Sequence, residues 1–376
     1  MKIKAAILKE MGLPMPYAES LPLKVEEINL ESPGPGELLV KIRASGLCHS
    51  DLSVINGDRP RIMPMVLGHE SSAEVVELGE GVKDFSVGDH VILVFVPSCG
   101  ICPSCREARP ALCEPGGKAN TEGTLLSGAR RLTNNTGEQL NHHTGVSCFA
   151  EYAVVSTGSC VKVEQRISHR EAALFGCAVL TGAGAVINRA NFSAGDSAVV
   201  VGLGGVGFSA LLAAAAAGSR RLVAVDFSDE KLELAKELGA THTINPQLFK
   251  SHVEMLEHIG GPVDFGFDMA GAVPAFETAY ALTKKGGETI TAGLPHSNAE
   301  FGLILARLVG EEKTIRGSYL GSGVPSRDIP KYIDLYLRGK LPVDKLMGKT
   351  FTLDSINEGF DHLASGSSLR DAIIFD

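Results

Sequence analysis

The sequence of 376 residues contains no long apolar run, no low-complexity segment and no long block of like charges. Its most hydrophobic stretch, residues 172–187, is interrupted by three glycines and one threonine and falls short of a membrane-spanning helix. The first residues include lysines but lack the continuous apolar segment of a secretory signal peptide. These absences predict a cytoplasmic protein without a membrane partner.

A surplus of positive charge is also missing, since 35 Lys and Arg residues stand against 44 Asp and Glu residues, for a net charge of -9. Because contact with nucleic-acid phosphates needs a basic face, we expect no nucleic-acid partner. A hydrophobic content of 44% together with 43 glycines is typical of an ordered α/β protein. The length favours two domains, each large enough to bury its own core.

The pattern of apolar residues changes along the chain. Short β-branched runs separated by turns occupy residues 36–95 and predict a compact, barrel-like β domain. Over residues 179–321, strand-like apolar segments alternate with helix-like segments, which predicts a parallel, doubly wound sheet covered on both faces. Helix-like and strand-like segments after residue 322 are compatible with either domain.

Four of the eight cysteines lie close together in the run SCGICPSCREARPALCEP. Their spacing, C-x2-C-x2-C-x7-C, allows one loop to place four thiolates around a single zinc ion in a closed, tetrahedral site without an open position. Redox-active thiols are the alternative, but a reducing cytosol favours ligands over disulfides. We therefore predict a structural zinc site formed by Cys99, Cys102, Cys105 and Cys113.

Residues 198–207, AVVVGLGGVG, carry the pattern G-x-G-x-x-G directly after a β-branched strand. Gly202 permits the tight turn, Gly204 lets a pyrophosphate approach the backbone, and Gly207 packs the following helix on the strand. Nineteen residues later, Asp226 ends a second strand, where a carboxylate binds ribose hydroxyls and repels the 2′-phosphate of NADP. The motif predicts NAD binding; the alternative is a plain glycine turn with a solvated aspartate.

Three further residues have the chemistry of a second metal site: Cys48 in GLCHSD, His69 in VLGHE and Cys177 in LFGCAVLTG. Two thiolates and one imidazole leave a fourth zinc position open, as catalytic zinc requires. Zinc bound in this way polarises an alcohol oxygen and lowers its pKa. Because the three residues are far apart in the sequence, a buried cysteine and a core histidine remain the alternative reading.

Taken together and in order, these motifs resemble the zinc-dependent alcohol dehydrogenases of the medium-chain dehydrogenase/reductase superfamily, over nearly the whole chain. The resemblance implies an α/β fold in which a GroES-like β-barrel catalytic domain is combined with a Rossmann domain, a doubly wound parallel sheet. The implied ranges are 1–178 for the catalytic domain, with a structural zinc lobe at about 95–115, then 179–321 for the NAD-binding domain and 322–376 for a return to the catalytic domain.

The resemblance also implies roles for individual residues. Cys48, His69 and Cys177 would bind the catalytic zinc, with Glu70 beneath it as an occasional alternative ligand. Ser50 matches a hydroxyl that takes the substrate proton, and Asp51 matches a carboxylate that orients the zinc-bound histidine. Phe95 resembles an aromatic residue of the substrate pocket. Residues that match cofactor contacts are His49, Thr181, Gly202, Gly204, Gly205, Val206, Gly207, Asp226, Lys231 and Arg370.

Several positions depart from relatives of this family. His49 stands where some members place an arginine against the pyrophosphate, and Ser53 stands where some place a relay histidine, so the route of the proton to solvent differs. The long polar segment 114–148 favours a dimer by analogy, although an ordinary surface loop is an equal alternative. We expect His142 and His143 in this segment to be solvated, and Cys148 and Cys160 to be unremarkable buried thiols.

From the sequence we thus predict a cytoplasmic, NAD-dependent zinc alcohol dehydrogenase with two Zn²⁺ per subunit. It would convert a primary alcohol, bulky or aromatic ones included, reversibly to an aldehyde, as a homodimer or alternatively a tetramer. One rival is an S-(hydroxymethyl)glutathione (formaldehyde) dehydrogenase, although relatives of that type have an arginine where only Lys118 follows the last structural cysteine. The remaining rival is a non-catalytic protein that binds NAD or zinc.

Overall fold

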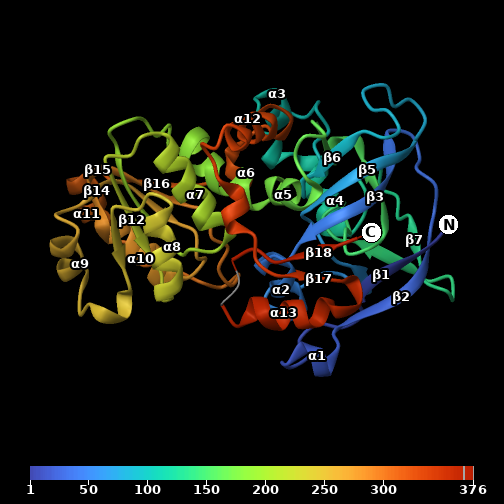
Figure 1. Cartoon of the computed structure of the whole chain (residues 1–376), viewed down its shortest axis with the longest axis horizontal. Helices are drawn as coiled ribbons and strands as arrows, with labels where there is room; N and C mark the ends of the chain where they lie inside the picture. Colours follow the sequence, from blue (N-terminus) through green and yellow to red (C-terminus); the bar gives the residue numbers. More distant parts are fainter. Residues whose placement is uncertain (367–368, 376) are drawn as a thin grey trace. The chain divides into compact units, whose positions relative to one another are not determined.

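A computed structural model of the protein describes residues 1–366 and 369–375 (Figure 1). The chain divides into two compact units, and each unit combines segments that are distant in the sequence. Unit 1 consists of Met1–Cys177, Val324–Asp334 and Met347–Asp376, and unit 2 consists of Ala178–Gly323 and Leu335–Leu346.

Unit 1 is built on two β-sheets. One is a closed barrel with the strand order β1-β2-β7-β8-β4, and the other has the order β10-β6-β5-β3-β18-β17, with β9 paired to β3. The strands are β1 (Lys2–Leu8), β2 (Leu23–Leu30), β3 (Glu37–Gly46), β4 (Met65–Val66), β5 (Ser71–Leu78), β6 (His90–Leu93), β7 (Leu132–Thr133), β8 (Gln139–His142), β9 (Tyr152–Ser156), β10 (Cys160–Val163), β17 (Thr350–Phe351) and β18 (Ala372–Ile374).

Short helices connect these strands. The α-helices of unit 1 are α1 (Tyr17–Ser20), α2 (His49–Ile55), α3 (Pro103–Arg106), α4 (Glu114–Glu122), α5 (His169–Ala173) and α13 (Ile356–Ala364), and α12 (Pro325–Leu337) begins in this unit. The 3₁₀ turns are η1 (Pro110–Leu112), η2 (Thr157–Ser159), η3 (Leu174–Gly176) and η8 (Leu353–Ser355).

Unit 2 is a parallel sheet with the strand order β13-β12-β11-β14-β15-β16. Its strands are β11 (Ser197–Val201), β12 (Arg221–Val225), β13 (His242–Ile244), β14 (Val263–Asp268), β15 (Thr283–Thr291) and β16 (Thr314–Gly317). Its helical segments are α6 (Ala178–Gly184), η4 (Ala185–Arg189), α7 (Gly205–Ala216), α8 (Asp229–Glu237), η5 (Pro246–Leu248), α9 (His252–His258), α10 (Val273–Leu282), α11 (Leu305–Glu311), η6 (Leu320–Ser322) and η7 (Val343–Leu346).

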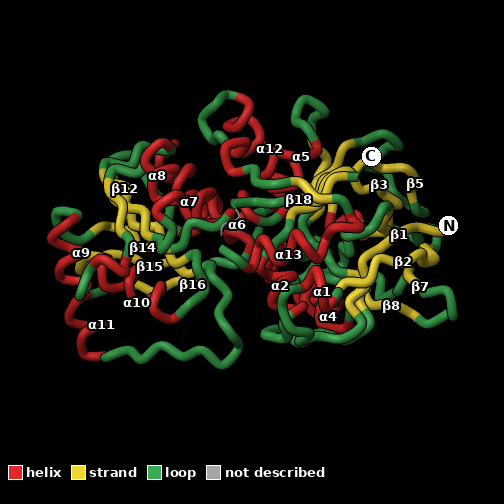
Figure 2. Tube along the Cα trace, turned by 60° about the horizontal axis from the view of Figure 1, so that its bottom comes forward, coloured by secondary structure: helices red, strands yellow, loops and turns green. Residues whose placement is uncertain are grey.

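The first strand of this sheet, β11, lies in its middle, and the chain builds outward on one side and then on the other. β11 has the sequence SAVVV and is buried at all five positions, as expected for a parallel strand covered on both faces. Figure 2 shows helices on both sides of these strands. The predicted combination of a β-barrel with a doubly wound parallel sheet is therefore confirmed.

The polar segment 114–148 is not an ordinary surface loop, so this alternative is wrong. It contains α4 and the strands β7 and β8, and both strands are part of the closed barrel. Leu125, Leu132 and Leu140 are almost fully buried in a core cluster of unit 1. Three leucines spaced along a polar background are enough to anchor the segment, because each buries its side chain against the barrel.

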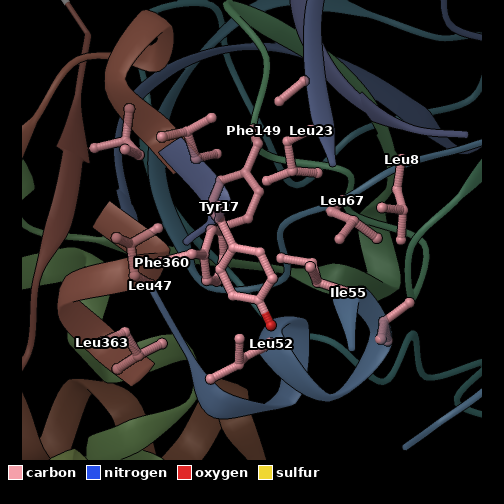
Figure 3. Packing of buried hydrophobic residues seen from close by; sticks show 14 of the residues in the cluster. Leu8, Tyr17, Leu23, Leu47, Leu52, Ile55, Leu67, Phe149, Phe360 and Leu363 are labelled. Carbon is pink, nitrogen blue, oxygen red and sulfur yellow. The ribbon is translucent and has the colours of Figure 1, made fainter. Parts of the chain in front are cut away.

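A cluster of buried hydrophobic side chains joins α2 and α13 to the barrel strand β1 (Figure 3). The rings of Phe149 and Phe360 meet edge to face, with 5.8 Å between their centroids. Such close packing leaves little space into which the structure can relax when a side chain is shortened.

The same cluster fixes the backbone next to Cys48 and His69 (Figure 3). Leu47 directly precedes Cys48, Leu67 lies two positions before His69, and Leu52 lies on the helix that follows Cys48. Burial of these leucines therefore fixes the segments that carry the cysteine and the histidine.

Among the described residues, no single helix is long and apolar enough to cross a membrane. One bent pair, His169–Gly176 with Ala178–Arg189, passes the same test of length and composition. The break between its two helices falls at Cys177, and most residues of the pair are buried within the protein.

We predict that Phe360→Ala destabilises unit 1 by about 3–5 kcal/mol, because the substitution removes a fully buried ring and leaves a cavity. Urea unfolding followed by circular dichroism measures the change. Phe227→Ala serves as the control, since the side chain of Phe227 is 67% exposed and its removal should change the free energy of unfolding little. Equal effects of the two substitutions would contradict the prediction.

Candidate metal centres and cofactor site

The four sulfur atoms of Cys99, Cys102, Cys105 and Cys113 lie within 4.8 Å of one another. Backbone N–H groups point at two of them: the amide of Cys102 donates to Cys99 Sγ at 3.3 Å, and that of Cys99 donates to Cys113 Sγ at 3.3 Å. The backbone amide of Cys105 is the main cause that lowers the pKa of Cys102 to about 7. Burial raises the pKa of Cys105 to about 12 and also raises that of Cys113. Four sulfurs held by one loop nevertheless fit a closed zinc site, because zinc displaces the protons of its thiol ligands.

A second group of donors brings together Cys48, His69, Glu70 and Cys177, whose ligand atoms also lie within 4.8 Å of one another. All four side chains are buried. Cys48 follows β3 and precedes α2, His69 and Glu70 lie between β4 and β5, and Cys177 follows η3.

Strand pairing explains how residues more than a hundred positions apart meet. Ser45 of β3 is opposite Ser71 of β5, which brings the segment before Cys48 beside Glu70. Ser71 is also opposite Leu93 of β6. The backbone of Gly176 lies so close to the carbonyl oxygen of Leu93 that a Cβ at this position would be only 2.2 Å from it. The sheet thus carries Cys177 to the same place.

The charge of the two thiols is unequal. A hydrogen bond from the Cys177 thiol, with help from Arg370 and His69, holds the pKa of Cys48 well below its usual range despite burial. The hydrogen bond that Cys177 donates to Cys48 raises the pKa of Cys177, and burial and the charge on Cys48 raise it further. Burial lowers the pKa of His69, but Asp51 and Cys48 outweigh it and raise the value to about 10. A metal ion binding here therefore displaces protons from the donors.

The fit of this site to zinc rests on an orphaned atom as well as on the donor chemistry. Both ring nitrogens of His69 are buried and make no well-formed hydrogen bond within the described part of the chain, and since Nδ1 faces Asp51 at 3.0 Å, Nε2 is the nitrogen left for a metal. Sulfur, sulfur and nitrogen donors around such a group match a zinc site that keeps one position open. Glu70 is fully buried in the same group and pairs with the guanidinium of Arg370.

Asp51 lies behind His69, on α2. Its Oδ2 is 3.0 Å from Nδ1 of His69, and its Oδ1 is 3.2 Å from Nδ1 of His143. Burial raises the pKa of Asp51, but the two histidines outweigh it and the net shift is downward. The structure thus gives Asp51 the contact with His69 that the family resemblance implies.

The expectation that His142 and His143 are solvated is wrong, since both side chains are almost fully buried. His142 ends β8 and His143 follows it; β8 pairs with β4 so that His142 is opposite Val66. The contact of His143 with Asp51 could not be predicted from the sequence, because His143 lies 92 positions after Asp51 and in a polar segment. The available signal was the short alternation of apolar and polar residues that precedes the histidine pair. Cys148 and Cys160 are buried, as expected.

The remaining residues around the donors lie on α2 or against His69. Ser50 is half-buried in the first turn of α2, and His49 beside it is exposed. The Ser53 hydroxyl donates to the carbonyl of His49 at 2.8 Å, within the same helix. The ring of Phe95 meets that of His69 edge to face, with 5.5 Å between centroids.

In unit 2, the glycine motif forms the turn between β11 and α7. Gly202 has a φ of +90°, which L side chains rarely adopt, and a Cβ on Gly207 would lie 1.7 Å from the carbonyl oxygen of Gly202. A Cβ on Gly204 would meet nothing within 4 Å, so the backbone there is open to a ligand. Gly205 begins α7. These positions reproduce the separate roles of the three glycines in binding a dinucleotide.

Asp226 follows β12 and is bonded to this turn. Its Oδ2 accepts the backbone N–H of Leu203 at 2.7 Å, and its Oδ1 accepts that of Ser228 at 3.0 Å. The carboxylate therefore stabilises the glycine turn through the Leu203 amide. The side chain of Asp226 is half-buried. Lys231 lies in the first turn of α8, whose N-cap is Ser228.

Thr181 and Val206 come together through two helices of unit 2. Thr181 is buried on α6, and the next residue, Gly182, packs against the carbonyl oxygen of Val206 on α7, where a Cβ would be 2.1 Å away. Arg370, the remaining residue matched to the cofactor, is buried in unit 1 and pairs with Glu70.

Comparison with known proteins gives two matching family models: the alcohol dehydrogenase GroES-like domain over residues 34–165 and the zinc-binding dehydrogenase over residues 205–338. An S-(hydroxymethyl)glutathione dehydrogenase of Paracoccus denitrificans is 34% identical, with all of both chains aligned. A putative alcohol dehydrogenase D of Mycobacterium tuberculosis is 37% identical, also with all of both chains aligned.

Among solved structures, a benzyl alcohol dehydrogenase from Acinetobacter calcoaceticus is 32% identical and aligns over all of both chains, with a TM-score of 0.92. Identity above 30% over the whole length is accompanied by the cysteine, histidine and glycine geometry described above. The chain belongs to the zinc-dependent alcohol dehydrogenases of the medium-chain dehydrogenase/reductase superfamily, whose cofactors are zinc and NAD.

Proposed function

We propose that the protein oxidises primary alcohols reversibly to aldehydes with NAD as the hydride acceptor, and that aromatic or bulky alcohols are among its substrates. The observation that carries the proposal is the meeting of the Cys48, His69 and Cys177 donor atoms within 4.8 Å. The catalytic domain would then comprise residues 1–178 and 322–376, and the NAD-binding domain residues 179–321.

Each residue of the site has a part in this reaction. Zinc held by Cys48, His69 and Cys177 would supply a Lewis acid that polarises the alcohol oxygen. Asp51 engages Nδ1 of His69 at 3.0 Å and thereby keeps Nε2 as the ligand atom. Ser50, two positions after Cys48 at the start of α2, takes the proton that the alcohol loses.

Cofactor contacts complete the proposal. The first N–H groups of α7, from Gly204 to Gly207, would hold the pyrophosphate, and Asp226 would accept the ribose hydroxyls. Thr181 and Val206 would pack on the nicotinamide, while His49, Lys231 and Arg370 would lie near the charged and ribose groups.

Aromatic alcohols are favoured by two observations. Phe95 lies edge to face on the zinc-ligand candidate His69, where its ring would adjoin the reacting carbon. One solved structure that is 32% identical to this chain is that of a benzyl alcohol dehydrogenase.

Oxidation of S-(hydroxymethyl)glutathione is the second candidate, because two relatives at 34% and 35% identity carry that name. The charges after the last structural cysteine do not favour it. Lys118 pairs with Glu122 at 3.8 Å on the exposed face of α4, and Arg131 is engaged by Glu37. Arg131 is therefore engaged within unit 1, and the exposed Lys118 lacks the planar fork by which a guanidinium binds a carboxylate.

We also propose a homodimer located in the cytoplasm. Three side chains at α11, Ile304, Leu305 and Val309, are between 68% and 76% exposed, and the neighbouring β16 is an edge strand of the parallel sheet. An exposed apolar helix beside an open strand edge suits a two-fold interface. Eight free cysteines, six of them candidate zinc ligands, suit a reducing compartment.

The substrate assignment is tested by NADH formation with benzyl alcohol, ethanol, and formaldehyde plus glutathione, each repeated with NADP. We expect the highest kcat/KM with benzyl alcohol and NAD. Turnover that depends strictly on glutathione would identify the second candidate instead, and a zinc-loaded protein that converts none of the three would contradict both.

Cys48→Ser and Cys105→Ser form a matched pair, since each removes one thiolate from one metal site. We expect Cys48→Ser to lose one zinc and nearly all turnover while NAD still binds, because Cys48 belongs to unit 1 and the glycine turn to unit 2. Cys105→Ser should instead lose one zinc and lower the melting temperature, because structural zinc contributes folding free energy. Zinc analysis, calorimetry and fluorescence titration with NADH measure these effects. Full activity of Cys48→Ser would contradict the assignment.

Asp226→Asn should raise the KM for NAD by about 10-fold and reduce the discrimination against NADP, because the like-charge repulsion of a 2′-phosphate is removed. Asp229→Asn is the control, since Asp229 is an exposed residue of the same segment. Steady-state kinetics with both cofactors measure the change. An unaltered ratio of kcat/KM for NAD and NADP would show that Asp226 does not face the ribose.

The double substitution Leu305→Asp with Val309→Asp should yield a monomer, because buried charges on both sides of a two-fold interface are costly. Sedimentation velocity measures the oligomeric state. Val87→Asp is the control, as Val87 is 65% exposed in unit 1 and should leave the dimer intact. A dimer that survives the double substitution would exclude α11 as the interface.

A further inference from the structure

Asp51 faces two imidazole rings, and only one of them belongs to the zinc ligands. Its Oδ2 lies 3.0 Å from Nδ1 of His69, and its Oδ1 lies 3.2 Å from Nδ1 of His143. The backbone N–H of Gly68 also donates to Oδ1, at 3.2 Å. The carboxylate is fully buried and His143 is only 3% exposed, so water does not compete for these contacts.

The backbone of His143 is held in place by a tight turn. The N–H of His143 donates to the Ser147 hydroxyl at 2.9 Å, and the carbonyl of His143 accepts from the amides of Val146 and Ser147 at 3.0 and 3.2 Å. Thr144 and Ser147 both have positive φ values, near +50°, which few residues adopt unless the surrounding structure requires it.

The same turn is bonded to the segment that leads to His69. The Ser147 hydroxyl donates to the carbonyl of Val66 at 2.8 Å, and the backbone N–H of Cys148 donates to the carbonyl of Gly68 at 3.2 Å. The position of the His143 ring is therefore coupled to the position of the zinc-ligand segment, and the two histidine rings meet edge to face with 5.6 Å between centroids.

The chemistry of a carboxylate fixes which ring nitrogens carry hydrogen. An ionised carboxylate only accepts hydrogen bonds, so at 3.0 and 3.2 Å from its oxygens Nδ1 of His69 and Nδ1 of His143 are favoured as N–H groups. In His69 this leaves Nε2 with its lone pair for the metal. In His143, the hydrogen on Nδ1 makes the ring a donor to Oδ1 of Asp51. This contact fixes the angle at which Oδ2 of Asp51 meets His69.

We propose that His143 is a positioning residue of the zinc site: it anchors the Asp51 carboxylate, and through Asp51 it orients the imidazole of His69. The proposal rests on the assignment of Cys48, His69 and Cys177 as zinc ligands. The substrate need not be known, because the effect is on metal affinity as well as on turnover.

His143→Leu and His143→Asn test the proposal as a pair of nearly equal shape. Asparagine places an amide N–H close to the position of Nδ1, whereas leucine places a methyl group there, so both leave the same space where the ring was. Zinc-loaded enzymes are titrated with a chromophoric chelator to measure the affinity of each zinc, and the catalytic site is identified by the zinc that Cys48→Ser lacks.

We expect His143→Leu to weaken binding of the catalytic zinc by about 10-fold or more and to leave the four-cysteine zinc unchanged, which is the usual effect of losing a partner behind a metal ligand. His143→Asn should recover most of this affinity. In enzyme with Co²⁺ at the catalytic site, the visible spectrum should shift for His143→Leu and remain close to wild type for His143→Asn. His142→Asn is the control, because His142 is equally buried but accepts the amide of Arg131 instead of facing Asp51.

The proposal would be overturned if His143→Leu bound the catalytic zinc with wild-type affinity. It would also be overturned if His143→Asn, or the control His142→Asn, lost as much zinc affinity as His143→Leu. A third zinc in the wild type that disappears with His143→Leu would also overturn it, since His143 would then be a ligand. Failure of the wild type to oxidise any alcohol while it retains both zincs would refute the proposed function alone.

If His143→Leu does not fold, the nitrogen chemical shifts of the His143 ring in the wild-type zinc enzyme provide the measurement, with His143→Asn for the assignment. A protonated Nδ1 supports the proposal, and an unprotonated Nδ1 overturns it.

Discussion

The buried carboxylate of Asp51 is the interaction on which the chemical site depends. A charge without access to water must be met by donors, and here three donors come from two segments: the amide of Gly68 and the ring of His69 after β4, and the ring of His143 after β8. These contacts are possible only when β4 and β8 pair in the observed register and α2 packs against the core. Electrostatic compensation and barrel closure therefore stabilise the same arrangement.

The two groups of metal donors differ in what holds them. Cys99, Cys102, Cys105 and Cys113 come from one short loop, so local backbone geometry is enough to bring the four sulfurs together. Cys48, His69 and Cys177 come from three segments and meet because β5 pairs with β3 on one side and β6 on the other. The first group can therefore stabilise its own loop, whereas the second forms only when the strands of unit 1 pair correctly. Only the second has the two-sulfur, one-nitrogen donor set that leaves a zinc position for substrate.

In unit 2 the glycine turn and Asp226 depend on each other. The carboxylate accepts the amide of Leu203 within the turn, so one side chain joins the end of β12 to the end of β11. Gly207 makes this possible, because any side chain there would collide with the carbonyl of Gly202. The pairing of adjacent parallel strands places both features at the carboxyl edge of the sheet, where dinucleotides bind in this fold.

Sequence by itself determined the features that depend on neighbouring residues. The cysteine spacing predicted the four-sulfur cluster, the glycine motif predicted the turn before α7, and the change from β-branched runs to alternating strands and helices predicted the two architectures. Only tertiary structure decided the contacts between distant segments: Glu70 with Arg370, and Asp51 with His143. His143 follows a polar stretch that looked solvated, and its burial became visible only once β8 paired with β4. The physical reason is that spacing encodes local geometry, whereas burial and ion pairing across the chain depend on strand register, which no single segment contains.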